Sequence, residues 1–96
     1  MVIGILQVEL VIGDAMSLKD KRRVLRSVKD RLGRIGQIAI AEVDEHETHR
    51  RAVLGIVTVS TTVPRAQSTL SKILDRLREN RLFVLNDHQM EILTGH

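Results

Sequence analysis

Two kinds of hydrophobic pattern alternate along this chain of 96 residues, and their order limits the folds that it can adopt. Residues 1–12, 37–44, 51–61 and 82–93 are rich in valine, isoleucine and leucine, which predicts β-strands. In residues 18–32 and 62–80 the apolar side chains recur every three or four positions, which predicts amphipathic helices. The predicted order of elements is therefore β-α-β-β-α-β.

This order favours an α+β ferredoxin-like sandwich formed by residues 1–96 as a single domain. Right-handed crossovers in both β-α-β halves produce a four-stranded antiparallel sheet with both helices on one face. The short polar connection at residues 45–49 predicts a hairpin between the second and third strands.

Local signals mark the boundaries of these elements. Ser17 followed by Asp20 resembles a capping box at the start of the first helix. Thr62 is a candidate N-cap for the second helix, and Pro64 lies in its first turn, where a missing N–H costs nothing. In the last strand the apolar positions change parity, which predicts a bulge near residues 86–88.

The first strand has two unequal faces. We expect its more apolar face to pack under the helices, with residues Val2, Leu6, Val8, Leu10 and Ile12. Ile3, Ile5 and Val11 then lie on the opposite face, which no helix covers. Because a monomer rarely exposes so much apolar surface, we expect a homodimer paired through the sheet at these three residues.

Composition excludes several classes of function. The chain has no Cys, Trp or Tyr and a single Phe, so disulfides, thiolate sites and aromatic stacking platforms are not expected. We find no membrane-spanning run and no secretory signal, and we expect a cytoplasmic protein. No catalytic constellation, Gly-rich phosphate loop or cofactor motif is present, which predicts a protein that is not an enzyme and has no cofactor.

Residues 44–49, with the sequence DEHETH, form the densest group of possible metal ligands. His46 and His49 are three residues apart with carboxylates between them, but their spacing is not that of HExxH and they fall in a predicted loop. We interpret the segment as a solvated acidic hairpin loop and predict no metal site.

Charge is distributed unevenly along the chain. The net charge is +3, yet residues 19–34 contain eight basic side chains against two acidic ones, a local net charge of +6. A basic helix in a helical layer attracts polyanions, although such a face can also serve only to keep a helix solvated. Lys21 differs because it falls within the apolar stripe, where it either extends past the core edge or is aimed at a specific partner. The candidate nucleic-acid-binding residues are Lys19, Lys21, Arg22, Arg23, Arg26 and Arg34.

Four short segments, taken in order, resemble the bacterial YlxP-like family, a domain of unknown function. They are residues 17–22 (SLKDKR), 41–43 (AEV), 51–55 (RAVLG) and 91–93 (EIL). The resemblance covers essentially the whole chain and implies the ferredoxin-like fold. Members of that family are commonly encoded among transcription and translation factors, which implies association with RNA or the ribosome. His49 and His88 occupy positions where the family often has aromatic residues.

These observations support two hypotheses about function. The first is a non-enzymatic domain that binds structured RNA or a ribosomal particle through its basic helical face. The alternative is a self-associating structural or regulatory module with a small ligand at a dimer seam. Affinity for nucleic acid distinguishes them.

Overall fold

The computed structural model describes residues 1–95 and contains six elements in the predicted order. The strands are β1 (Val2–Val11), β2 (Ile38–Asp44), β3 (Arg51–Ser60) and β4 (Val84–Thr94), and the helices are α1 (Leu18–Leu32) and α2 (Val63–Glu79). The β-α-β-β-α-β prediction is confirmed. At the start of α2, Thr62 Oγ1 accepts a hydrogen bond from the Arg65 N–H at 3.3 Å, as its predicted capping role requires.

The four strands form one antiparallel sheet in the order β2-β3-β1-β4. β1 is therefore a central strand, hydrogen-bonded along its length to β3 on one side and to β4 on the other. The register with β4 shifts between Glu9, which pairs with Asp87, and Leu10, which pairs with Leu85. Asn86 is the extra residue, so the predicted bulge is confirmed.

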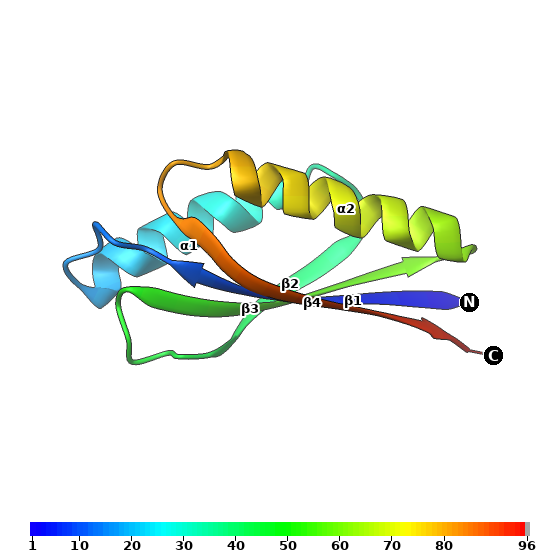
Figure 1. Ribbon diagram of the computed structural model, residues 1–96, viewed down its shortest axis with the longest axis horizontal. Helices are drawn as coiled ribbons and strands as arrows, with labels where there is room; N and C mark the ends of the chain where they lie inside the picture. The colour runs from blue at the N-terminus through cyan, green and yellow to red at the C-terminus, as the bar shows by residue number, and fades with distance from the viewer. Residues whose placement is uncertain (96) are drawn as a thin grey trace.

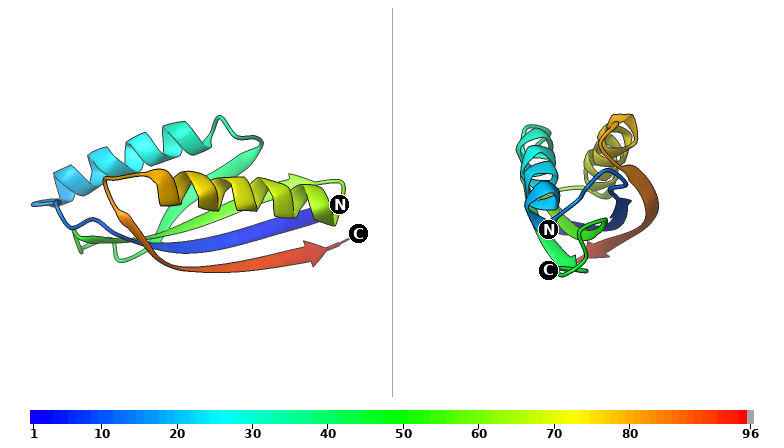
Figure 2. Two further views of the ribbon diagram at one scale, coloured as in Figure 1. Left: turned by 45° about the horizontal axis from the view of Figure 1, so that its top comes forward. Right: turned by 90° about the vertical axis from the view of Figure 1, so that its left-hand side faces the viewer.

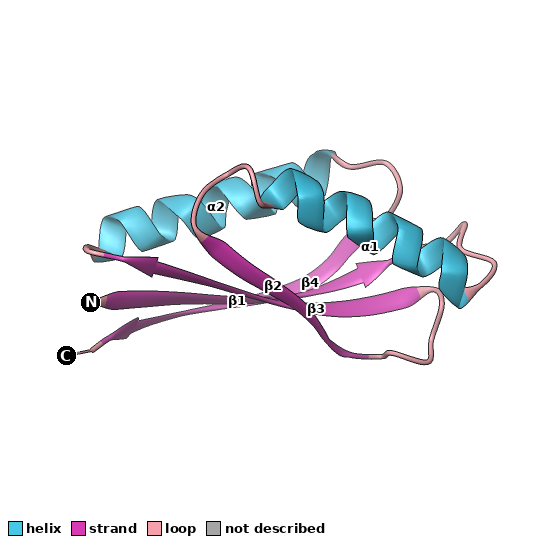
Figure 3. Cartoon of the chain, turned by 180° about the vertical axis from the view of Figure 1, so that it is seen from behind, coloured by secondary structure: helices cyan, strands magenta, loops and turns pink. Residues whose placement is uncertain are grey.

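Both helices cover the same face of the sheet, and in residues 1–95 no helix lies below the other face (Figure 1). The two additional views in Figure 2 show α1 and α2 side by side above the strands, and the reverse view in Figure 3 shows the same two layers. The predicted α+β ferredoxin-like sandwich is thus confirmed.

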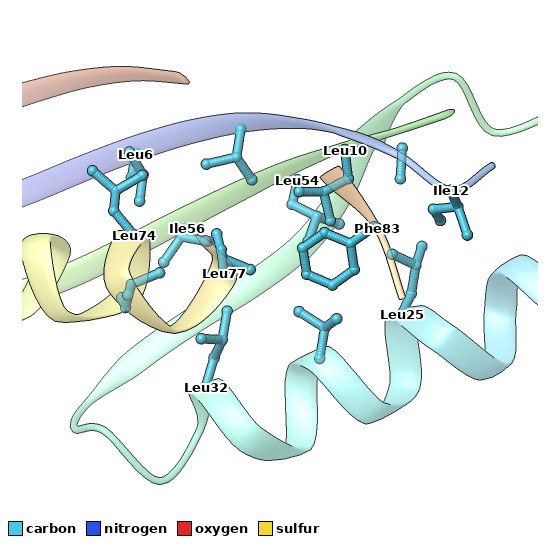
Figure 4. Close-up of a cluster of buried hydrophobic side chains, with 14 of the residues drawn as sticks. Leu6, Leu10, Ile12, Leu25, Leu32, Leu54, Ile56, Leu74, Leu77 and Phe83 are labelled. Carbon is cyan, nitrogen blue, oxygen red and sulfur yellow. The ribbon is translucent and has the colours of Figure 1, made fainter. Parts of the chain in front are cut away.

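The hydrophobic core lies between the two layers (Figure 4). Leu6, Leu10 and Ile56 project from the sheet and are fully buried, facing leucines from both helices. Burying a side chain of this size contributes roughly 1.5–3 kcal/mol to stability. Phe83, which precedes β4, closes one side of the core at 5% exposure. Core residues contributed by the helices are Leu25, Val28, Leu32, Leu70, Ile73, Leu74 and Leu77.

Gly4 allows α2 to approach the sheet closely. A Cβ atom at this position would lie 2.9 Å from Thr58 Cγ2 and 3.0 Å from Leu70 Cδ1. The contact with Thr58 is shorter than real Cβ atoms show, and the contact with Leu70 is tighter than most, so glycine at position 4 leaves room for the Thr58 methyl group and for Leu70 of α2.

The opposite face of the sheet, here called the outer face, is exposed. The burial pattern of β1 alternates as predicted, with Leu6 and Val8 buried under the helices and Ile3, Ile5 and Val11 on the outer face. In register beside them the outer face carries Val53, Val57 and Val59 of β3, Ala39 and Ala41 of β2, and Val84 and Leu93 of β4. Val43, at a register shift in β2, lies next to Gly55 on the same face.

Candidate nucleic-acid interface

α1 begins at a well-defined cap that fixes which of its side chains face solvent. Ser17 Oγ accepts a hydrogen bond from the Asp20 N–H at 3.1 Å, and Asp20 Oδ2 accepts one from the Met16 N–H at 2.9 Å. The predicted capping role of Ser17 is confirmed, while the Asp20 carboxylate reaches Met16, one residue before the cap. From this cap, Leu25, Val28 and Leu32 turn inward to the core.

Seven cationic side chains in α1 and the turn after it are exposed: Lys19, Arg22, Arg23, Arg26, Lys29, Arg31 and Arg34. Within residues 1–95, none of these seven has a carboxylate oxygen within 4.0 Å. Their charges are therefore available to a partner. An anion brought to this surface has no internal ion pair to displace.

Helical spacing separates these cations into two groups. Lys19, Arg22, Arg26 and Lys29 follow one another at intervals of three or four residues, which places them on one flank of α1, with Arg23 beside them. We call these five residues the cation stripe. It extends over about 15 Å at about 1.5 Å per residue.

Arg31 lies on the other flank, toward α2. It lines a groove of about 210 Å³ between the C-terminal halves of the two helices, together with Val28, Arg76 and Glu79. Arg34 lines a neighbouring hollow with Lys72, Arg76, Asp75 and Glu79. Glu79 in the groove, and Asp75 with Glu79 in the hollow, make both mixed in charge, so the cation stripe is the stronger anion-attracting surface.

Lys21 does not belong to the nucleic-acid surface, and its assignment as a binding residue was wrong. Its side chain is 2% exposed, and Nζ lies 2.6 Å from Glu42 Oε2. The same ammonium donates hydrogen bonds to the backbone carbonyls of Glu45 at 2.6 Å and Thr48 at 2.7 Å. Two hydrogen bonds and one ion pair from this ammonium thus hold the β2–β3 hairpin against α1.

Of the other predicted binding residues, Lys19, Arg22, Arg23 and Arg26 lie together, and Arg34 lies apart from them beyond the end of α1. The prediction omitted Lys29, whose place three residues after Arg26 is visible in the helical spacing. It also omitted Lys72 and Arg76 of α2, which are one helical turn apart but come close to Arg34 only through the packing of the helices.

The β2–β3 loop has a structural role in the residues described. His46 Nε2 lies 3.2 Å from the backbone carbonyl oxygen of Glu42, and Thr48 Oγ1 donates to Glu45 Oε2 at 3.0 Å. Glu45 has a φ of 61°, in the left-handed region that residues other than Gly and Asn avoid. In residues 1–95 no group of three or more His, Asp or Glu side chains is arranged to hold a metal ion.

The fold and this surface define a class: a ferredoxin-like α+β domain with a basic helical layer and an uncovered sheet face. The chain belongs to the family described as "Protein of unknown function (DUF503)", which matches residues 3–90. It is 33% identical over 72 residues to the uncharacterized protein YlxP of Bacillus subtilis (strain 168), covering 75% of this chain and 78% of that protein. The resemblance to the YlxP-like family is thus confirmed.

A solved structure shows a weaker likeness. An amidase of the hydantoinase/carbamoylase family from Burkholderia phymatum aligns with a TM-score of 0.48 and 13% identity. The alignment covers 99% of this chain but 29% of the amidase chain. Similarity of this degree shows neither an activity nor a partner. Neither helix in residues 1–95 has the length and apolar character needed to cross a membrane.

Proposed function

We propose that this chain binds structured RNA, free or within a ribosomal particle, through the cation stripe of α1. It acts in the cytoplasm and catalyses no reaction. The observation that carries the proposal is that the exposed cations of α1 have no carboxylate partner among the described residues. A helix made basic only for solvation gains as much from cations interspersed evenly with acidic side chains, whereas this flank of α1 carries the five cations of the stripe against one carboxylate, Asp30.

The physical basis of binding is neutralisation of phosphates. Each Lys or Arg that contacts a phosphate releases a condensed counterion, so affinity falls as salt rises. If four or five residues of the cation stripe contact a duplex backbone, log K falls against log salt with a slope of about −4.

Shape rather than base stacking guides recognition in this proposal. Phe83 is the sole aromatic residue of the chain, and it is buried in the core at 5% exposure. Without an exposed ring, the chain lacks the stacking platforms that bind unpaired bases. Phosphate and 2′-OH contacts along a structured RNA remain, which supports folded RNA over unstructured single strands as the ligand.

A filter-binding titration at several salt concentrations tests the proposal, with transfer RNA as the folded probe and polyuridine as the unstructured one. Arg23→Glu combined with Arg26→Glu should lower the affinity for transfer RNA by at least about tenfold, because two attractions become two repulsions. The matched control is Arg65→Glu combined with Arg78→Glu, which changes net charge equally but on α2. Both changes are on exposed helix surfaces, so folding should be retained in both variants.

Absence of binding at low salt, or binding that salt does not weaken, would contradict the proposal. Equal losses in the α1 and α2 variants would show that total charge, and not the cation stripe, determines affinity. Co-sedimentation with ribosomal subunits then distinguishes free RNA from a particle as the partner.

The self-association hypothesis concerns the other side of the sheet and does not compete with RNA binding, because both helices face away from it (Figure 1). A small ligand at a seam between copies stays a prediction. The outer face has a hollow that could take it, lined by Ile5, Gln7, Gln89, Met90 and Glu91. Native mass spectrometry of protein purified from cells tests it, since a bound ligand adds a constant mass that denaturation removes.

A further inference from the structure

The outer face of the sheet carries a continuous apolar patch at one end, not only apolar side chains at scattered positions. Val57 is 37% exposed and Val59 is 55% exposed, and they pair in register with Ile5 and Ile3 of the neighbouring central strand. Leu93, opposite Ile3 on the other side, is 43% exposed. The apolar surface thus runs without interruption across β3, β1 and β4 at the end of the sheet where β1 begins.

Charged residues on this face are concentrated toward its other end. Glu9 and Arg51 form an ion pair at 2.6 Å, and Asp87 pairs with Glu9 in the β-ladder. Near the apolar end, Glu91 lies on the edge strand beside Ile5. The apolar patch at one end of the outer face is thus bordered by the polar row of Gln7 and Gln89 and by Glu91, as the apolar part of a protein–protein interface is bordered by polar residues.

The molecule exposes more surface than its mass requires. Its accessible surface is 6254 Å², whereas a compact monomer of 10.8 kDa exposes about 5,500 Å². The chain is correspondingly elongated, with extents of 44 × 22 × 19 Å. The outer face itself covers about 600 Å², for four strands about 4.8 Å apart and about 33 Å long.

We infer that the outer face is covered by the outer face of a second copy, with Ile5 and Val57 near the centre of a two-fold interface. Pairing the two faces buries roughly 1,200 Å² in total, which reaches the lower end of the range for specific interfaces. The helical layers are less suited to pairing, because α1 and the turn after it bring seven unpaired cations, whereas the outer face has Glu9, Asp87 and Glu91 partly offset by Arg51. This inference goes beyond RNA binding and does not depend on it, since the cation stripe stays exposed on both copies.

Sedimentation velocity from low to high micromolar concentration tests the inference. The wild-type chain should sediment at twice its mass of 10.8 kDa. Val57→Lys combined with Val59→Lys should sediment as a folded monomer, with the dimer dissociation constant raised by more than about tenfold. Val57→Thr combined with Val59→Thr is a second variant that keeps shape and strand preference, and it should weaken the dimer to a smaller extent.

The matched control is Leu82→Lys combined with Met16→Lys. These residues are 50% and 74% exposed and lie in loops away from the outer face, so the control should remain a dimer. A wild-type monomer at every concentration would overturn the inference. A dimer that persists in both valine double variants would also overturn it. So would loss of the dimer in the double variant Arg23→Glu with Arg26→Glu, or assembly of the wild-type chain into open polymers instead of a closed pair.

Discussion

Replacing Lys21 by methionine tests what holds the β2–β3 hairpin to α1. Methionine keeps most of the length of the side chain and removes the ammonium. The change removes the cation that pairs with Glu42 Oε2 and the donor to the backbone carbonyls of Glu45 and Thr48. Glu42 Oε2 is itself buried and has no hydrogen bond in the described residues apart from its contact with the Lys21 ammonium.

The expected loss of stability follows from these contacts. Removing one partner of a buried ion pair costs about 3–5 kcal/mol, because the other charge stays buried and uncompensated. The Glu42 side chain is 19% exposed and can regain part of its hydration, so we expect about 3 kcal/mol. For a domain of this length such a loss lowers Tm by about 15 °C.

Urea denaturation followed by circular dichroism measures the change in the free energy of unfolding. Arg22→Met is the matched control, since Arg22 is the next residue on α1 but exposed, and its cost should stay within about 0.5 kcal/mol. Adding Glu42→Leu to Lys21→Met should recover part of the loss, because no buried carboxylate remains. The reasoning is refuted if Lys21→Met costs less than about 1 kcal/mol, or no more than Arg22→Met.

Two further predictions concern backbone and packing. Gly4→Ala should destabilise the fold by about 1–3 kcal/mol in the same denaturation assay, because its Cβ would meet Thr58 and Leu70. The control is Gly36→Ala, whose stability should stay near that of the wild type because nothing lies within 4 Å of the added atom. Glu45→Val should lower the free energy of unfolding by about 1–2 kcal/mol more than Glu45→Asn. Both substitutions remove the hydrogen bond from Thr48, but only the β-branched valine is strained at a φ of 61°. Equal stabilities of the two variants would contradict this.

Strand faces were predictable because one side of the sheet is buried. A shift of one residue in β1 would turn Leu6 and Val8 to solvent, so the alternation in the sequence determines the register. The same logic located the bulge at Asn86, where the apolar positions of the last strand change parity. Both features depend on residues close together in the chain.

The role of Lys21 could not be predicted in this way. Helical spacing placed it among apolar residues, but its carbonyl partners are 24 and 27 residues further along the chain. Their positions depend on how the hairpin folds back on α1, which no local pattern encodes. The sequence also could not predict which cations of α1 face α2. Helical spacing separates Arg31 from the cation stripe, but only the packing of the two helices determines that Arg31 lies on the flank toward α2.

The central position of β1 also determines the order in which the fold can be completed. The β2–β3 hairpin joins neighbouring segments and closes a short loop. Val2 of β1, in contrast, pairs with Ser60, more than half the chain away, and with Thr94, near the opposite end of the described chain. Closing such long loops is slow, so we expect the pairing of β1 with β4 to form last. Until β4 docks, the most apolar strand has an open edge, and we expect aggregation of partly folded chains to begin at that edge.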